Sequence, residues 1–392
     1  MALAVSSTPL LNRQQPISQP RRRGRAISLL LGLAGGLAGF FAPALASPAS
    51  LAAWLIGFLA ALSAGVLLHE LGHLAAGILA DFEFHQILAG PWMVTKEMVT
   101  GESSGYQVRF LPRRILTFAG HTQMIPRTTE NLRRGFAIFA AGGPVATALL
   151  FLPVLLVPWG PAAFCLLAAN LVLAAFSWIP MTIAGFHTDG KILLTLAGTG
   201  PSSESFAAVL YVMAIDQRGV EPHQWPPEIV DRLQSETAGG WRAREFRGEA
   251  ALLLAIRALD GGETTAMAAA LEQVLGNAAR LRPDQRRICF AEAAFFQGVH
   301  QRNAALALDW LQDARQVKGG VTLKDWDAAA QAAVAISEEN WDQARAQIAR
   351  AIARLDRQPG RHGSVVAWRR RLVALRDSLP AGASTAVRYP GT

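Results

Sequence analysis

The chain has 392 residues, of which 51% are hydrophobic and only 17% charged, a composition too apolar for an ordinary soluble protein. Its net charge of +8 is concentrated in residues 1–200, where 13 Lys and Arg stand against 7 Asp and Glu. Because this half is also the more apolar, the excess indicates membrane topology and argues against a nucleic-acid partner. Cys165 and Cys289 have no near neighbour in sequence, which argues against a disulfide framework or a cysteine zinc site.

Residues 1–26 form a basic N-terminal segment that we expect to be disordered, and four apolar stretches follow. Each approaches or exceeds the roughly 20 residues that cross a bilayer core. They are Ile27–Ala46, Leu51–Ala80, Phe136–Val157 and Pro161–Pro180. The sequence therefore predicts a membrane domain over residues 27–200 that binds the lipid bilayer.

Positive charge sets the expected orientation of these spans. Four arginines lie within residues 21–25, before the first stretch, and seven Lys and Arg lie in the segment Asp81–Arg134. Both segments are expected in the cytoplasm, which places both termini there. The Ala-, Gly- and Arg-rich composition suggests a bacterial inner membrane. The first stretch also fits a cleaved signal peptide, because Ala44-Leu45-Ala46 precedes Ser47.

The segment 81–134 between the second and third stretches contains alternating polar and apolar residues. Met93–Thr100 and Tyr106–Phe110 are separated by the Gly- and Ser-rich Gly101–Gly105. This pattern predicts a β-hairpin insertion. One role of such a hairpin is to bind an extended peptide along its exposed strand edge; alternatively, the hairpin only caps the membrane face.

The second stretch contains the sequence His69-Glu70-Leu71-Gly72-His73. In a helix, His69 and His73 lie one turn apart on one face, where two imidazoles can bind one zinc ion. Glu70 lies beside the first and can accept a proton from zinc-bound water. A carboxylate at membrane depth is costly, which favours a functional role over a chance match.

A zinc site of this kind needs a third protein ligand. Asp189 is the first acidic residue after a charge-free block that runs from residue 135 to residue 188. His187 is a rival ligand, and His85 and His121 are weaker ones. Asp189 also fits the N-cap position of a helix, which would explain it without a metal.

These motifs resemble the site-2 protease family of intramembrane zinc metalloproteases. The resemblance rests on the His69–His73 motif, on Gly142-Gly143-Pro144 in the third stretch, and on Pro180 followed by Asp189-Gly190, and it covers about Leu51–Ala197. It implies a core of three helices and one Zn²⁺ per chain. It further implies that His69, His73 and Asp189 bind the metal and that Glu70 is the catalytic base.

The chain departs from the family pattern near Pro180. Ser177 stands where the family has the asparagine of its Asn-x-x-Pro motif, and Asn170 lies about two turns upstream. Together with Gly142, Gly143 and Pro144, these two residues are candidates for positioning substrate. The gap from Pro180 to Asp189 is also longer than usual, and the peptide-binding insert of many bacterial relatives is not evident.

Gly142-Gly143-Pro144 also has a direct physical interpretation. Proline interrupts a helix's hydrogen-bond ladder, and glycines allow another segment to approach closely. A break there would leave room for an extended substrate beside the metal. The alternative is a simple packing kink.

The remaining chain is more polar and helical. Residues 201–248 are expected to form helices and a linker, Pro222–Pro227, and residues 249–378 a helical domain. Val299–Ala314 and Ile336–Ala351 align at an offset of 37 residues, a period close to that of tetratricopeptide repeats, and Ala258–Leu271 resembles a third, poorer copy. Such a domain would bind a protein partner. Residues 379–392 are expected to be disordered.

The predicted fold is thus an all-α polytopic membrane protein with a site-2-protease-like core, a β-hairpin insertion and a tetratricopeptide-like C-terminal domain. The leading functional hypothesis is an intramembrane zinc protease that cleaves membrane-spanning or membrane-associated proteins in regulated proteolysis. The alternative is a non-proteolytic membrane scaffold whose metal site is structural or inactive. A metal transporter would require more polar residues along several spans.

Overall fold

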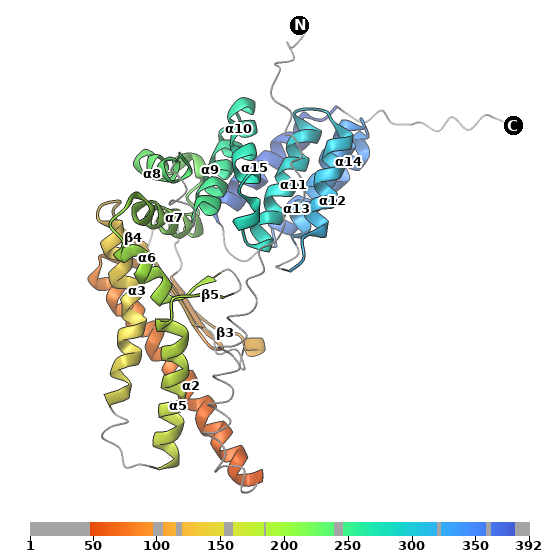
Figure 1. Cartoon of the computed structure of the whole chain (residues 1–392). Helices are drawn as coiled ribbons and strands as arrows, with labels where there is room; N and C mark the ends of the chain where they lie inside the picture. Colours follow the sequence, from red (N-terminus) through yellow and green to blue (C-terminus); the bar gives the residue numbers. More distant parts are fainter. Residues whose placement is uncertain are drawn as a thin grey trace, which may run out of the picture. The chain divides into compact units, whose positions relative to one another are not determined.

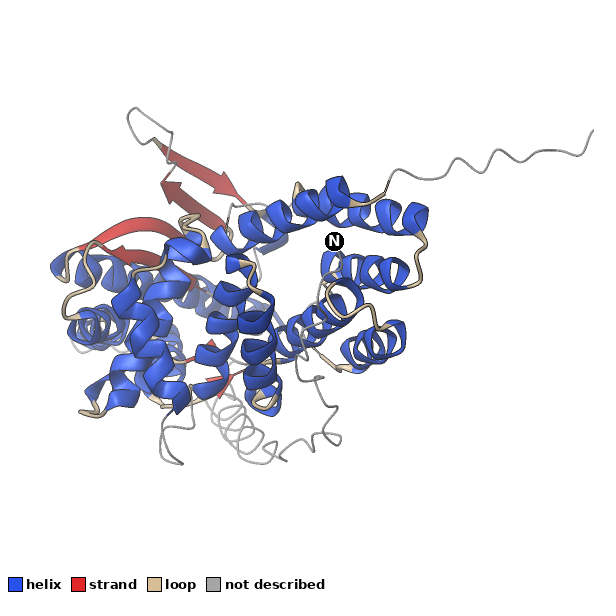
Figure 2. Cartoon of the chain, turned by 90° about the horizontal axis from the view of Figure 1, so that it is seen from above, coloured by secondary structure: helices blue, strands red, loops and turns tan. Residues whose placement is uncertain are grey.

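A computed structural model describes residues 48–96, 105–114, 120–152, 160–183, 186–238, 246–319, 323–357 and 362–380 (Figure 1). The first predicted span, Ile27–Ala46, and the predicted disordered segments 1–26 and 381–392 lie outside these residues. The chain divides into two compact units between Ala214 and Ile215. Helices make up most of both, and strands a small part (Figure 2).

The first unit is built on two apolar helices, α2 (Pro48–Leu79) and α5 (Pro161–Trp178). They are the two helices in the described residues that are long and apolar enough to cross a membrane. The 29 residues of Leu51–Leu79 span about 44 Å, more than the roughly 30 Å of a hydrocarbon core. These helices correspond to the second and fourth predicted spans.

The third predicted span, Phe136–Val157, differs from the expectation. Its described helix, α3 (Leu132–Leu149), starts four residues earlier, carries Arg133 and Arg134 in its first turn, and ends at Leu149. Helix α3 does not meet the length and hydropathy criteria that α2 and α5 meet. The rest of the predicted span, residues 153–157, lies outside the described residues. The chain is therefore mostly helical with two candidate spans among its described residues.

Small residues allow α2, α3 and α5 to lie side by side (Figure 1). A Cβ atom on Gly142 of α3 would lie 2.7 Å from the carbonyl carbon of Gly72 on α2, closer than real side chains approach. Glycine is therefore required where the two backbones meet. This contact fixes α3 against the part of α2 that carries the histidines.

A four-stranded antiparallel sheet follows α2, in the order β3-β2-β1-β4. The predicted hairpin is confirmed in β2 (Trp92–Lys96) and β3 (Tyr106–Phe110), which pair from Trp92 with Phe110 to Lys96 with Tyr106. The sheet is larger than predicted, because β1 (Phe82–Ala89) and β4 (Gly120–Pro126) extend it. A short 3₁₀ helix, η2 (Pro112–Arg114), follows β3. The fold is therefore not purely helical.

A second, smaller hairpin lies between α5 and the next helix. Strands β5 (Thr182–Ile183) and β6 (Phe186–His187) pair, and α6 (Asp189–Ala197) begins directly afterwards. Helix α7 (Pro201–Gln217) then leads out of the first unit.

The second unit consists of helices. They are η3 (Pro222–Gln224), α8 (Pro227–Ala238), α9 (Arg247–Gly261), α10 (Thr264–Leu275), η4 (Ala278–Arg280), α11 (Pro283–Val299), α12 (Ala304–Gln316), α13 (Lys324–Ser337), α14 (Trp341–Leu355) and α15 (Gly363–Ser378). Consecutive helices pack as pairs, α9 with α10, α11 with α12 and α13 with α14. The expected linker Pro222–Pro227 is packed into this unit, because Trp225 is only 2% exposed.

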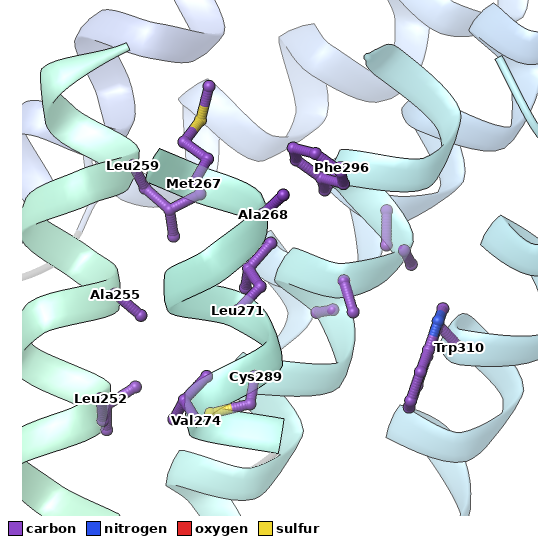
Figure 3. Close-up of a cluster of buried hydrophobic side chains, with 14 of the residues drawn as sticks. Leu252, Ala255, Leu259, Met267, Ala268, Leu271, Val274, Cys289, Phe296 and Trp310 are labelled. Atoms are coloured by element: carbon purple, nitrogen blue, oxygen red, sulfur yellow. The ribbon is translucent and has the colours of Figure 1, made fainter. Parts of the chain in front are cut away.

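The core of the second unit is formed by one face of each helix. Leu252, Leu259, Met267, Leu271 and Phe296 belong to one buried cluster that joins α9, α10 and α11 (Figure 3). Helix α9 ends where Gly262 takes a left-handed conformation, with φ 78°. Glycine adopts this conformation without strain and so allows the tight connection into α10.

The 37-residue sequence repeat corresponds to a structural repeat. Arg302 and Glu339 both have positive φ, of 52° and 57°. The next residues, Asn303 and Asn340, cap α12 and α14 through their side-chain oxygens. Ala307 and Ala344, which align in the sequence, are both fully buried. The two copies thus share their turn, cap and packing position; their membership of the tetratricopeptide class remains a prediction.

Candidate metal centre

The helical spacing of α2 brings two imidazoles together. The Nε2 atoms of His69 and His73 lie 3.2 Å apart, and their rings meet edge to face with centroids 4.8 Å apart. Both residues are buried, with 9% and 5% of their surfaces exposed. The two Nε2 atoms are therefore close enough to bind one metal ion.

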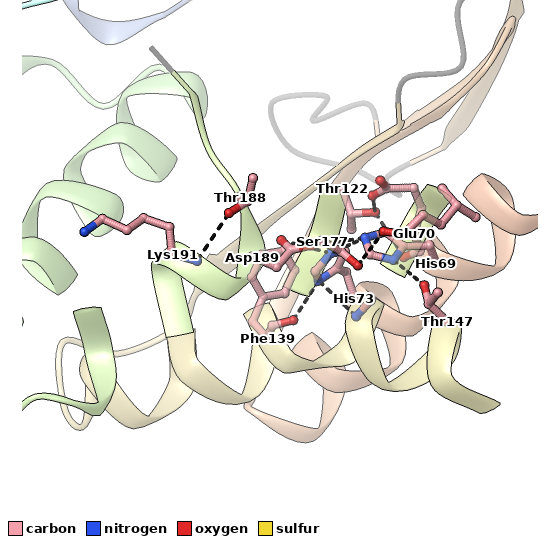
Figure 4. A network of polar contacts seen from close by, with 12 residues as sticks. His69, Glu70, His73, Thr122, Phe139, Thr147, Ser177, Thr188, Asp189 and Lys191 are labelled. Carbon is pink, nitrogen blue, oxygen red and sulfur yellow. Dashed lines mark hydrogen bonds and ion pairs between the residues drawn. The ribbon is translucent and has the colours of Figure 1, made fainter. Parts of the chain in front are cut away.

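Asp189 supplies a third donor from a distant part of the sequence (Figure 4). Its Oδ2 lies 3.1 Å from Nε2 of His69, and its Oδ1 lies 3.4 Å from Nε2 of His73. Burial raises the pKa of this carboxyl, but its contacts with the two imidazoles outweigh that effect and lower the pKa to about 2. An ionised oxygen and two imidazole nitrogens within 4.8 Å of one another form a ligand set suited to a divalent cation.

The outer nitrogens of the imidazoles are also held. Nδ1 of His73 lies 2.8 Å from the carbonyl oxygen of Phe139, and Nδ1 of His69 lies 2.8 Å from the hydroxyl of Thr147. A carbonyl can only accept, so Nδ1 of a neutral His73 carries the proton and donates it. In this neutral form Nε2 carries the lone pair that a metal ligand requires, whereas the contacts with Asp189 that lower the pKa of its carboxyl use protonated Nε2 atoms.

A local closure in the backbone places Asp189. Thr188 donates its N–H to the carbonyl of Met181, at 3.1 Å, and its hydroxyl to the carbonyl of Ile179, at 2.8 Å. These bonds close the β5–β6 hairpin and return the chain to the end of α5. The long interval between Pro180 and Asp189 is therefore taken up by the hairpin.

Asp189 is not the N-cap of α6. Thr188 occupies that position, and its side-chain oxygen accepts from the N–H of Lys191. The N-cap explanation of Asp189 is therefore wrong. Directly after Asp189, a Cβ on Gly190 would lie 2.6 Å from the carbonyl carbon of Trp178, so glycine allows α6 to start against α5.

Glu70 is not part of this ligand group, and its carboxylate is held by strand β4. The hydroxyl of Thr122 donates to Oε2 of Glu70 at 2.6 Å, and a Cβ on Gly120 would lie 2.7 Å from the Glu70 carboxyl carbon. Gly120 and Thr122 are two positions apart, so they lie on one face of the strand. The carboxylate is only slightly exposed, at 5% for the whole residue, and lies beside the histidines without joining the ligand set.

The Gly142-Gly143-Pro144 motif makes close contacts and does not break the helix. Helix α3 continues through Pro144. Gly142 contacts α2, and a Cβ on Gly143 would lie 2.5 Å from Nε2 of His69. The motif therefore allows α3 to pass directly over the two imidazoles, and the expected helix break is not observed.

The two polar residues considered for substrate have partners elsewhere. The hydroxyl of Ser177 donates to the carbonyl of Leu173 one turn earlier in α5, and the amide of Asn170 donates to the carbonyl of Leu150. Both side chains are buried. The Ser177 bond lies within α5 and the Asn170 bond joins α5 to the end of α3, and the role of both residues with substrate remains a prediction.

The rival histidines are not part of the ligand group. Nδ1 of His187 lies 2.9 Å from the hydroxyl of Thr182, and Nε2 of His121 lies 2.9 Å from the amide of Gln123. His85 is also outside the three-residue group. Within the described residues, Asp189 is thus the third ligand that the geometry favours.

Sequence analysis did not identify Thr122, Thr147 or Gly120. No motif connects Thr122 to Glu70, 52 positions away, because a strand delivers it through the tertiary fold. The position of Thr147 could have been suspected from the sequence, because it lies four residues after Gly143 and so on the same face of α3.

A second group of metal-ligand residue types, Glu221, His223 and Asp260, lies in the second unit. There the guanidinium of Arg370 already bonds both carboxylates, and His223 bonds Asp260. A positive side chain occupies the position that a cation would take, so this group is a salt-bridge network joining η3, α9 and α15. Among the described residues, no Lys or Arg side chain forms an ion pair with Asp189.

Comparison with known proteins gives no match: no protein-family model, no curated protein and no solved structure is significantly similar to this chain.

Proposed function

We propose that the chain is a membrane-embedded zinc metallopeptidase that hydrolyses peptide bonds of membrane-spanning or membrane-associated proteins. The observation that carries this proposal is the convergence of His69, His73 and Asp189, from α2 and α6, with Glu70 held beside them. The motif resemblance to site-2 proteases supports the same assignment.

The residues fit one zinc ion per chain. Two neutral imidazoles and one carboxylate leave a fourth coordination position for water or substrate. Bound Zn²⁺ would polarise the scissile carbonyl and make a water molecule more acidic. The chain's own contribution is to present the ligand atoms through the bonds of Thr147 and Phe139, and to hold Glu70 where it can accept the proton from water and deliver it to the leaving nitrogen.

Strand β4 supports the binding of an extended substrate. It is an edge of the described sheet, paired with β1, and it passes beside Glu70 through Gly120 and Thr122. A peptide added along its outer edge would have exposed carbonyls next to the carboxylate, whereas a helical peptide would hide them in its own hydrogen-bond ladder. The sequence interpretation assigned this role to the predicted hairpin; β4 lies closer to the catalytic residue.

The location of the site supports a substrate in the membrane. His69, Glu70 and His73 lie within the candidate span Leu51–Leu79. The arginine distribution and composition support a multi-pass orientation in a bacterial inner membrane with both termini in the cytoplasm. The multi-pass orientation in a bacterial inner membrane is thus part of the proposed function.

The test combines metal content with cleavage. Full-length protein is purified in detergent, and zinc is measured by mass spectrometry for the wild type, Glu70→Gln and Asp189→Ala. We expect about one zinc per chain in the wild type and in Glu70→Gln and a large loss in Asp189→Ala, because Asp189 is a proposed ligand and Glu70 is not. Cleavage is followed in proteoliposomes with a panel of single-span test proteins labelled at both ends.

The outcomes separate the two functions. Zinc retention with loss of cleavage in Glu70→Gln supports the peptidase. A wild type that binds no divalent metal contradicts it, and so does a Glu70→Gln variant that cleaves as well as the wild type. Bound zinc without cleavage of any test protein favours the non-proteolytic scaffold, which the engagement of Ser177 and Asn170 within the helices also favours.

A further inference from the structure

The second unit contains a large cavity that the proposed peptidase chemistry does not use. Its volume is about 1080 Å³, and it is lined by residues of η3, α8, α9 and α10. A helix about 10 Å across that rises 1.5 Å per residue fills about 120 Å³ per residue. The cavity therefore matches about nine helical residues, or two and a half turns.

Two helix faces line the cavity, and alanine and glycine make up more than half of their lining positions. On each helix the lining positions follow the spacing i, i+3, i+4 and i+7, which is one face. They are Leu254, Arg257, Ala258 and Gly261 on α9, and Ala266, Ala269, Ala270 and Gln273 on α10. The opposite face of α10 carries large residues such as Met267 and Leu271, which fill the core (Figure 3). Short side chains on the cavity side leave room for another helix to approach.

Arg257 gives the cavity a specific chemical preference. Arg257 lines the cavity and forms no ion pair with a described residue, and its Nε is buried without a hydrogen-bond partner. The guanidinium group is planar and positively charged, and it matches a carboxylate with two parallel hydrogen bonds. Glu263 and Glu272 also line the cavity, and their charge disfavours polyanions such as nucleic acids.

We propose that this cavity is a docking groove for an α-helical segment of a partner protein, which presents one carboxylate to Arg257 and basic side chains to Glu263 and Glu272. The proposal does not depend on the peptidase function, because none of these residues belongs to the metal centre.

The test uses a phage-displayed library of 15-residue helical peptides, selected against the purified full-length chain in detergent. We expect selected peptides to share one acidic residue, with Lys or Arg one turn away and small or apolar residues on the same face. A synthetic copy is then measured by fluorescence anisotropy. Replacing its acidic residue with the amide should weaken binding at least tenfold, and Arg257→Gln in the chain should do the same.

Two matched controls separate the groove from general effects. Ala269→Trp fills the groove and should abolish binding, whereas Ala305→Trp, at an exposed alanine of α12, should not change it. Arg350→Gln removes an exposed arginine of α14 and should leave the affinity unchanged. Thermal melting of each variant shows whether it folds; if Ala269→Trp does not, the Arg257→Gln and peptide-amide results decide.

Three outcomes would overturn the proposal. The first is selection that yields no binders or no shared acidic residue. The second is unchanged affinity in both Arg257→Gln and folded Ala269→Trp. The third is a wild-type oligomer that Ala269→Trp dissociates into monomers, because a second copy of the chain would then be the occupant of the groove.

Discussion

Gly143→Ala tests the packing of α3 over the candidate metal centre. The added Cβ would lie 2.5 Å from Nε2 of His69 and 2.6 Å from its Cε1, whereas ordinary contacts begin at 3.4 Å. The imidazole must therefore move by about 1 Å, or α3 must withdraw by as much. Metal–ligand distances tolerate only about 0.2 Å of change.

This displacement sets the expected size of the effect. Loss of a single outer-shell bond to a metal ligand typically lowers affinity about 10- to 100-fold. A shift of the ligand itself should cost at least the upper value, so we expect about a 100-fold loss of zinc affinity, which is about 2.7 kcal/mol. The assay is competition for Zn²⁺ between the purified full-length chain and a fluorescent chelator.

Two further glycine variants give the comparison: one is a control without a new contact, and the other disturbs the packing of α3 against α2. Gly200→Ala, where a Cβ meets nothing within 4 Å, should bind zinc like the wild type. Gly142→Ala contacts the backbone of α2 and should lower thermal stability as well as affinity. Wild-type zinc affinity and melting temperature in Gly143→Ala would show that α3 does not constrain the imidazoles.

Three more predictions concern other parts of the chain. Thr122→Val removes the hydroxyl that orients Glu70, so kcat for any cleaved test protein should fall about 10- to 100-fold with zinc content unchanged, and a normal kcat would exclude this role. Gly298→Ala places a Cβ 2.5 Å from a backbone carbonyl carbon of α13, so thermal unfolding should show a destabilisation of about 1–3 kcal/mol, and an unchanged midpoint would contradict the close packing. The hydrogen bond to Asp216 raises the pKa of His362 in the folded state, so its stabilising effect is complete below the unfolded value of about 6.5 and disappears as pH rises through the folded pKa. The melting temperature of His362→Gln should therefore fall furthest below the wild type at pH 6 and approach it at pH 9; a gap independent of pH would disprove this linkage.

Several elements of both units could be predicted because their signals are local. A long apolar run with at most one charged residue favours an apolar environment, so α2 and α5 were predictable as helices capable of crossing a membrane. The pairing of β2 with β3 was predictable from alternation around a Gly- and Ser-rich turn. The 37-residue repeat was visible because two copies of one hairpin reuse the same alanine, as Ala307 and Ala344 show.

The predictions failed where an element depends on distant partners. Strand β4 was not identified, and its pairing with β1 across more than thirty residues has no local signature. Pro144 suggested a helix break, yet α3 remains helical because it is held against α2 at Gly72. Trp225 lies in a Pro-rich segment that suggested a linker, but its indole is buried in the second unit.

The sequence by itself determined that two imidazoles lie on one face of α2 with a carboxylate beside them, because a helix repeats every 3.6 residues wherever it sits. Only the tertiary structure decided that Asp189, and not His187, His85 or His121, completes the group. That choice depends on how the β5–β6 hairpin closes through Thr188 and returns the chain to α5. Spacing along a helix is a property of the backbone, whereas a meeting of residues 120 positions apart is a property of packing.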